Sequence, residues 1–268
     1  MIFNLSKTII KKNQFVTSPL TQSHMLLAID VGNTRIKGAV FEQHTLLEAF
    51  VFSKEAFQIN ANAILKRYPK CSDMILAAVG NIEKEAILSW GKNLNVHFVS
   101  RQDHFPFRNL YKTPQTLGID RMVLAAGAVW QFPNQNRLVI DAGTCITYDF
   151  IDVANNYTGG AISPGLKMRY ESLHHYTAKL PLLTIKDPAQ AIGNSTNESI
   201  HSGVVNGITH EIDGFINQYQ QQYANFIIIL TGGDAEFLAK RLKNTIFANS
   251  NFLLESLNQT FQYKIKND

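Results

Sequence analysis

The feature that most constrains the fold of this chain is a short pattern that occurs twice. The segments AIDVGNT (28–34) and VIDAGT (139–144) both place apolar residues before an Asp, which Gly and Thr follow. The two aspartates, Asp30 and Asp141, lie 111 positions apart, and each turn is followed by a strand-like segment that carries an acidic residue. A duplicated fold with one such turn in each half explains the repetition, although unrelated β-hairpins also reuse these turn residues.

Strand and helix patterns are mixed around both turns, which is typical of the α/β class. Apolar runs predict strands at 25–30, 36–42, 45–52, 73–80, 96–100, on both sides of the turn within 137–152, at 157–165 and at 226–230. Helical spacing predicts helices at 55–68, 83–92, 119–131, 166–177, 198–222 and 234–244. The polar, proline-containing stretch 101–117 is expected to form a loop.

Composition indicates a globular chain. Of its 268 residues, 45% are hydrophobic and 17% are charged. The chain is long enough for two mid-sized domains. The two cysteines, Cys71 and Cys145, cannot form a disulfide framework, and this favours a reducing cytoplasm. No apolar run approaches the roughly 18 residues that a membrane span needs, so no membrane partner is expected.

The net charge of +4 is unevenly distributed. The first 24 residues contain Lys7, Lys11 and Lys12 and no acidic residue. These lysines supply three of the four net charges, so the remainder is nearly neutral and gives little support for a nucleic-acid partner. We expect residues 1–24 to be a flexible extension before a folded region that starts near Met25.

The two turns have the chemistry of a site for a nucleoside triphosphate. Glycine lets the backbone approach phosphate oxygens, and the exposed N–H groups of a tight turn bind anions. Lys37 adds a positive charge, while Asp30 and Asp141 offer hard oxygen ligands that suit magnesium and potassium. The chain contains neither a P-loop nor a dinucleotide-binding glycine motif.

Five segments stand in order along the chain: DVGNTRIK (30–37), GIDR (118–121), DAGTCITYD (141–149), GGAISPG (159–165) and TGGD (231–234). Together they resemble the motif set of the type III pantothenate kinases, a family related to acetate and sugar kinases, heat-shock ATPases and actin. The resemblance covers about residues 25–250. It implies an α/β fold of two duplicated ribonuclease-H-like, actin-like ATPase halves, at 25–117 and 118–268, with ATP in the cleft between them.

The resemblance also implies roles for individual residues. ATP is expected to contact Asp30, Val31, Gly32, Asn33, Thr34, Arg35, Ile36, Lys37, Thr144, Thr231, Gly232 and Gly233. Pantothenate is expected to contact Tyr111, Gly118, Ile119, Asp120, Arg121 and Thr196, with Asp120 as the catalytic proton acceptor. Asp141 would bind a monovalent cation, K⁺ or NH₄⁺, and Asp30 is a candidate Mg²⁺ ligand. The segment 159–165 would lie near the interface of a homodimer.

The implied reaction is ATP-dependent phosphorylation of pantothenate to 4′-phosphopantothenate, the first step of coenzyme A biosynthesis. Such a transfer depends mainly on positioning and charge neutralisation. Asp120 opens a predicted helix whose dipole favours an ionised carboxylate, and the guanidinium of Arg121 suits a substrate carboxylate. Two alternatives stay open: a non-catalytic regulator of the same fold that acts as a transcription accessory factor, and a kinase for another small hydroxyl substrate. The presence of Asp30, Asp120 and Asp141 favours the enzyme.

Several of these residues also have simpler interpretations. Taken alone, Asp120 can be an aspartate at a helix N-terminus, and Arg121 a neighbouring arginine on the surface. Thr196 can be a helix cap, because Asn197 and Glu198 follow it. Tyr111 can be an ordinary half-buried tyrosine. The two Asp-Gly turns make the functional interpretation the stronger one for the GIDR segment.

Overall fold

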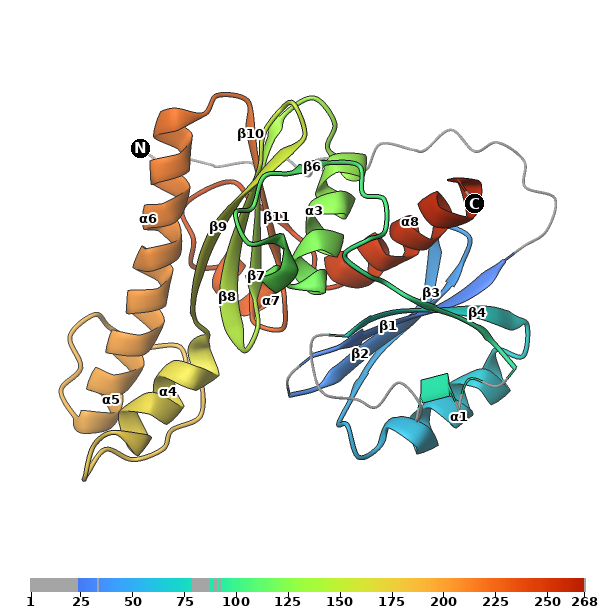
Figure 1. Cartoon of the computed structure of the whole chain (residues 1–268). Helices are drawn as coiled ribbons and strands as arrows, with labels where there is room; N and C mark the ends of the chain where they lie inside the picture. The colour runs from blue at the N-terminus through green and yellow to red at the C-terminus, as the bar shows by residue number, and fades with distance from the viewer. Residues whose placement is uncertain (1–23, 33, 79–86, 89–90, 92, 268) are drawn as a thin grey trace, which may run out of the picture.

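Two mixed β-sheets form the frame of the molecule (Figure 1). The computed structural model describes residues 24–32, 34–78, 87, 88, 91 and 93–267. In this part of the chain the first sheet has the order β3-β2-β1-β4-β5 and the second the order β11-β10-β7-β8-β9-β6. The first sheet consists of β1 (Met25–Val31), β2 (Ile36–Glu42), β3 (Thr45–Phe52), β4 (Cys71–Ala78) and β5 (Asn95–Phe98). The second consists of β6 (Arg108–Asn109), β7 (Asn136–Ala142), β8 (Cys145–Ile151), β9 (Asn156–Pro164), β10 (Phe226–Thr231) and β11 (Phe247–Ala248).

The two sheets repeat one plan. β1 pairs antiparallel with β2 and parallel with β4, and β7 pairs antiparallel with β8 and parallel with β10. The order β9-β8-β7-β10-β11 therefore repeats β3-β2-β1-β4-β5, and β6 extends the second sheet beyond β9. The duplicated architecture that the repeated turn predicts is confirmed.

The helices lie on the faces of the sheets and between them. They are α1 (Phe57–Arg67), α3 (Ile119–Gln131), α4 (Leu166–His175), α5 (Thr196–His201), α6 (Gly207–Gln222), α7 (Ala235–Ala239) and α8 (Phe252–Asn267). A π-helical turn at Ser202–Asn206 joins α5 to α6, so these three form one continuous helix. In Figure 1 this long helix stands on the outer side of the second sheet, and α1 lies under the first.

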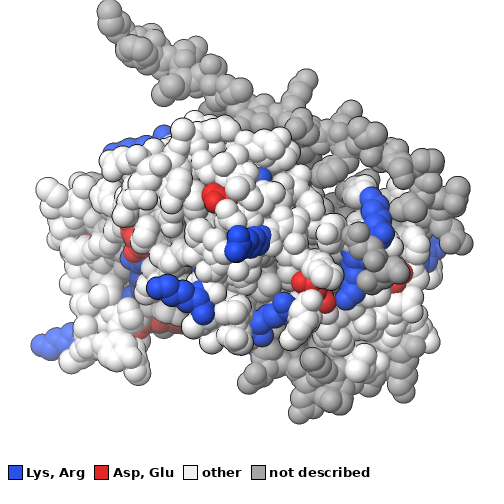
Figure 2. All heavy atoms as spheres, turned by 45° about the horizontal axis from the view of Figure 1, so that its top comes forward, with Lys and Arg blue, Asp and Glu red and all other residues white. Residues whose placement is uncertain are grey.

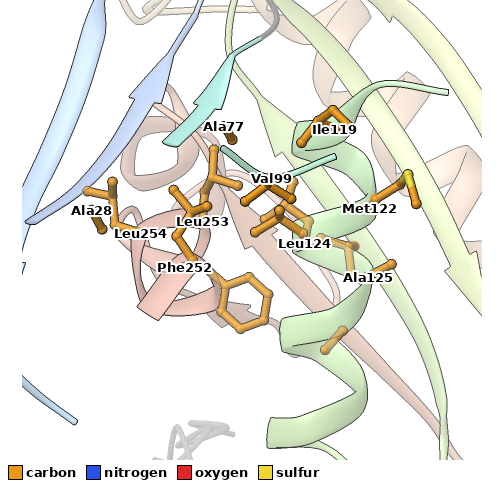
Figure 3. Close-up of a cluster of buried hydrophobic side chains, with 14 of the residues drawn as sticks. Ala28, Ala77, Val99, Ile119, Met122, Leu124, Ala125, Phe252, Leu253 and Leu254 are labelled. Atoms are coloured by element: carbon orange, nitrogen blue, oxygen red, sulfur yellow. The ribbon is translucent and has the colours of Figure 1, made fainter. Parts of the chain in front are cut away.

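A hydrophobic core between the two sheets holds the halves together. Helices α3 and α8 pack against each other there, α8 also against β1 and β4, and α3 also against β7 and β8. Figure 3 shows how side chains of α3, such as Leu124, meet Phe252 and Leu253 of α8 and Val99, which follows β5. Because α3 is anchored in this core, its N-terminus has a fixed position relative to both sheets.

Most predicted elements are found, and the differences fall where the pattern is weak. The strands at 36–42 and 45–52 and the helix at 119–131 have the predicted bounds. The predicted loop at 101–117 contains β6 and a short 3₁₀ helix at Pro114–Thr116. The predicted helix at 234–244 is shorter, ending at Ala239, and α8 was not predicted. Most of the predicted helix at 83–92 lies outside the described residues, as do residues 79–80 and all but His24 of the predicted extension.

The predicted boundary between the two halves, near residue 118, stays a prediction. Elements before and after it contact the sheet of the opposite half. β6, which precedes it, pairs with β9 of the second sheet. The final helix, α8, packs on the first sheet. None of the helices in the described part of the chain is long and apolar enough to span a membrane.

Candidate active site

The tips of the two predicted phosphate turns meet across the cleft between the sheets. The hydroxyl oxygens of Thr34 and Thr144 lie 3.2 Å apart, although 110 residues separate them in sequence. The β1–β2 turn is closed by the Gly32 N–H, which donates to the Arg35 carbonyl, and the β7–β8 turn by the Gly143 N–H, which donates to the Cys145 carbonyl. The structure therefore brings together the two turns whose similarity the sequence showed. Asn33 lies outside the described residues.

Asp30 lies at the end of β1, directly opposite Lys37 on β2. Its side chain is buried, and this burial raises the pKa of Asp30 from 3.8 to about 7, against the attraction of Lys37. Repulsion from Asp120 and Asp141 raises the pKa of Asp30 further. Three carboxylates from different parts of the sequence thus share one region of the cleft.

Asp141 occupies the equivalent place at the end of β7. It stands between Thr147 of β8 and Thr231 of β10 in the strand register. Burial raises the pKa of Asp141 to about 6, and Asp120 is again among the groups that repel it. The hydroxyl oxygens of Thr147 and Thr231 are buried and have no hydrogen-bond partner among the described residues. Asp141 is therefore flanked by two buried hydroxyl oxygens. Burial raises the pKa of Asp149, and the Thr147 hydroxyl, which also lies near that carboxylate, lowers it.

Gly232 follows Thr231 and lies directly against the Asp141 strand. The φ angle of Gly232 is +99°, a backbone conformation that residues other than glycine rarely adopt. A Cβ at this position would lie 2.5 Å from Asp141 Oδ1. Asp234, two residues further, donates its backbone N–H to the Ala142 carbonyl. Burial raises the pKa of Asp234, whereas Lys37 and Arg35 lower it. The TGGD segment thus closes one wall of the site.

Asp120 lies in the first turn of α3, after Gly118 at the N-cap. A Cβ at Gly118 would collide with Asp120 Oδ1, so the glycine leaves room for the carboxylate. Asp120 Oδ1 accepts a hydrogen bond from the Arg121 backbone N–H at 2.9 Å. Burial raises the pKa of Asp120, against the attraction of Arg121. A carboxylate whose pKa is raised in this way suits a proton acceptor.

Arg121 is buried, which excludes the surface arginine of the simpler interpretation. Its guanidinium forms an ion pair with Asp149 at 2.7 Å and lies 5.7 Å from the centre of the Tyr111 ring. Burial alone would lower the pKa of Arg121, but Asp149 raises it, so the group stays charged. Tyr111 in turn packs over Gly159, whose φ is +109° and where a Cβ would lie 3.0 Å from the ring. Tyr111 and Arg121 are therefore neighbours in one pocket wall.

Thr196 is the predicted substrate residue that the structure does not place with the others. It lines a pocket of about 990 Å³ between α4 and the start of the α5–α6 helix, together with Arg169, Ser199 and Ile200. Figure 1 shows this region well away from α3. The helix cap is Ser195, whose Oγ accepts from the Glu198 backbone N–H, so Thr196 is the first helical residue rather than the cap.

The remaining predicted ATP residues differ in what they present to the cleft. Val31 and Ile36 are fully buried in the first sheet, so only their backbone is available to a ligand. Thr34 and Arg35 are exposed at the turn, and Lys37 is half-buried. Among the residues that the structure describes, no group of three or more His, Cys, Asp or Glu side chains is arranged to hold a metal ion.

Sequence reasoning missed several residues of the site. Asp149 and Thr147 lie on the strand after the second turn, and Tyr157 lies on the next one. Asp149 and Asp234 belong to segments that the motif set included, and alternation along β8 places Asp149 on the same face as Thr147. What sequence could not show is that this face meets Arg121.

Comparison with solved structures defines the class of protein. A conserved putative Baf family transcriptional activator from Campylobacter jejuni matches with a TM-score of 0.60 at 21% identity, covering 90% of this chain and 99% of that one. A putative N-acetylmannosamine kinase from Listeria monocytogenes matches with a TM-score of 0.52 at 12% identity, with the same coverage. At these identities the likeness shows the fold alone. The duplicated two-sheet α/β architecture is thus the fold that this chain shares with sugar kinases of known structure.

Sequence comparison identifies the family. The family model for type III pantothenate kinase matches residues 26–218. A type III pantothenate kinase from Flavobacterium johnsoniae is 67% identical over 244 residues, covering 91% of this chain and 100% of that protein. Another from Flavobacterium psychrophilum is 60% identical over 240 residues, covering 90% of this chain and 100% of the relative. The chain belongs to the type III pantothenate kinase family.

Proposed function

We propose that this protein transfers the γ-phosphoryl group of ATP to the terminal hydroxyl of pantothenate, giving 4′-phosphopantothenate for coenzyme A synthesis. The observation that carries the proposal is the approach of the two Asp-Gly turns, with the Thr34 and Thr144 hydroxyls 3.2 Å apart, in a chain of the pantothenate kinase family. Two turns with free backbone donors suit the phosphates of ATP, and the Asp120 carboxylate suits the acceptor hydroxyl.

The two turns would hold the triphosphate of ATP. The hydroxyls of Thr34 and Thr144 lie 3.2 Å apart, and Lys37, opposite Asp30, adds a positive charge. On the far side of β7, Thr231 to Gly233 would border the adenosine. Because phosphoryl transfer needs little covalent chemistry from the protein, such positioning is the main contribution of these residues.

The residues present also fit a monovalent cation and Mg²⁺. Asp141, Thr147 and Thr231 offer three oxygen ligands in a row across β8, β7 and β10, and both hydroxyl oxygens are buried. Asp30 lies beside the first turn and would contribute to Mg²⁺ binding. When bound, these cations would neutralise phosphate charge and the charge of Asp30 and Asp141, whose pKa values are raised mainly by burial.

Asp120 would accept the proton of the attacking hydroxyl, and Arg121 would bind the carboxylate at the other end of pantothenate. Gly118 and Ile119 would contribute backbone contacts, and Tyr111 would cover the substrate. The buried position of Asp120 supports the role of proton acceptor, because a carboxylate with raised pKa holds a proton more readily. Asp120 and Arg121 are adjacent in the first turn of α3, so one helix would present both groups to the substrate.

Thr196 reaches the substrate only if a second copy of the chain supplies it, because in one chain it lines a separate pocket. We therefore propose a homodimer in which the region of β9, α4 and α5 meets the partner. A molar mass of two chains in size-exclusion chromatography with light scattering would support this arrangement, whereas a monomer with full activity would refute it.

The nearly neutral charge favours a small-molecule kinase over a nucleic-acid-binding regulator. On the face that Figure 2 shows, the described Lys and Arg side chains mostly lie apart, with neutral and acidic residues between them. Both cysteines, Cys71 and Cys145, are free, which fits the proposed cytoplasmic location.

The test is direct detection of the product. Purified protein is incubated with ATP, Mg²⁺, K⁺ and pantothenate, and phosphopantothenate is measured by mass spectrometry. Asp120→Asn is expected to lose about 10²-fold or more of kcat, as expected for removal of a general base. The matched control is Asp213→Asn, which changes a buried carboxylate on α6. No product with either K⁺ or NH₄⁺, from folded protein that binds ATP, would overturn the assignment.

A further inference from the structure

Asp149 is a fully buried carboxylate on β8 that none of the proposed roles uses. Its Oδ1 atom accepts two hydrogen bonds, from Arg121 Nε at 2.8 Å and from the Tyr157 hydroxyl at 2.5 Å. Arg121 Nη2 forms an ion pair with the same oxygen at 2.7 Å. Convergence of these contacts on one buried oxygen fixes both the carboxylate and the guanidinium.

The bond to Asp149 decides where the Arg121 guanidinium can point. An arginine side chain has many rotamers and loses conformational entropy when one of them is fixed. Here Asp149 holds the Nε–Nη2 edge, which uses two of the five N–H donors of the planar group. The other N–H donors are not committed to Asp149, and Tyr111 lies against the guanidinium.

Without Asp149, the Arg121 guanidinium could form an ion pair with another carboxylate. Asp120 is its neighbour in the chain, and Asp120 in turn lies close enough to Asp30 and Asp141 to repel them. A freed arginine would be drawn to Asp120, whose carboxylate it already attracts. It would then be unavailable to a substrate carboxylate.

We propose that Asp149, supported by Tyr157, is a positioning residue that holds Arg121 ready for the substrate carboxylate and so makes the site specific for carboxylate-bearing substrates. This inference rests on the proposed function. Asp149 does not touch the substrate. It acts through Arg121, by keeping the guanidinium away from Asp120 and beside the Tyr111 ring.

The test compares pantothenate with pantothenol, in which a hydroxymethyl group replaces the carboxylate. The measured quantity is the ratio of kcat/KM for the two substrates, in which any general loss of activity cancels. The wild-type protein is expected to prefer pantothenate. Arg121→Gln should abolish the preference, and Asp149→Asn should reduce it about tenfold, the loss expected for misplacing one charge-assisted hydrogen bond.

Two further variants separate specific from general effects. Tyr157→Phe keeps the Asp149 charge and removes one donor, so it should reduce the preference by a smaller factor, about threefold, and it carries the test if Asp149→Asn does not fold. Asp213→Asn changes another buried carboxylate, on α6, and should keep the wild-type preference.

The outcomes distinguish this inference from the function on which it rests. An unchanged or increased preference in Asp149→Asn, with the preference lost in Arg121→Gln, would overturn the role of Asp149 alone. An unchanged preference in Arg121→Gln would overturn the role of Arg121 in carboxylate binding. Absence of any phosphorylated product from the wild-type protein would overturn the proposed function itself.

Discussion

Gly127→Ala in α3 is expected to destabilise the protein, although alanine is the better helix former. Gly127 lies in the middle of α3, where it crosses α8. A Cβ there would collide with Ser256 Oγ and lie 2.6 Å from Ser256 Cβ and 3.3 Å from its Cα. Rotation of the hydroxyl cannot relieve the contact with Cβ, so the two helices would have to separate.

The magnitude follows from two opposed effects. Replacing glycine by alanine in a helix interior stabilises by about 1 kcal/mol. Overpacking a close core contact costs about 1–3 kcal/mol. Because the contact involves a Cβ and a nearby backbone atom rather than a flexible chain end, we expect the upper part of that range. The net effect of Gly127→Ala is then a loss of about 1–2 kcal/mol.

The assay is urea unfolding of a set of matched variants. Gly214→Ala on α6 is the control, because a Cβ at Gly214 meets nothing within 4 Å, and it should stabilise by up to about 1 kcal/mol. In a Ser256→Gly background the obstruction is gone, so Gly127→Ala should become neutral or stabilising. Stabilisation by Gly127→Ala in the parent chain would refute the packing argument.

Two further predictions concern the cleft. In the metal-free protein, burial raises the pKa of Asp30 from 3.8 to about 7. The contribution of protonated Asp30 to the free energy of unfolding is therefore fully present below about pH 4 and is lost as the pH rises to about 7. The shift corresponds to a change on the order of 4 kcal/mol. Asp30→Asn should therefore unfold at higher urea than the parent at pH 8 with EDTA, and equal midpoints would contradict this. Gly165→Ala should raise the KM for ATP about tenfold more than that for pantothenate, because a Cβ would collide with the Gly143 carbonyl beneath the second turn. A KM for ATP that stays unchanged in steady-state kinetics would show that the turn tolerates the displacement.

The predictable part of the fold is the part governed by local pattern. The strand–turn–strand units at Asp30 and Asp141 and the helix from Ile119 to Gln131 follow from apolar runs and turn residues alone. Helix α8 carries an equally apolar stripe that includes Phe252, Leu257 and Phe261, but it lies beyond the motif set and no prediction covered it.

The candidate site was predictable residue by residue only where a motif named it. The turns and Asp120 were found in this way, and whether they act in catalysis stays a prediction. Asp149 lies within one of the motifs, but the sequence predicts no role for it, because its partner, Arg121, is 28 residues away. Thr196 was assigned to the substrate although in one chain it lines a different pocket. Contacts between distant segments depend on how the halves pack, which no local pattern contains.

The sequence by itself determined two Asp-Gly turns, the strands that carry them and the helix that presents Asp120. These features depend on backbone preferences and apolar periodicity, which act over a few residues. The tertiary structure alone decided that Thr34 meets Thr144, that Arg121 is tied to Asp149, and that Gly127 lets α3 approach α8. The reason is physical: burial of the common core sets the distances between segments that are far apart in the chain, and those distances place the charges of the cleft.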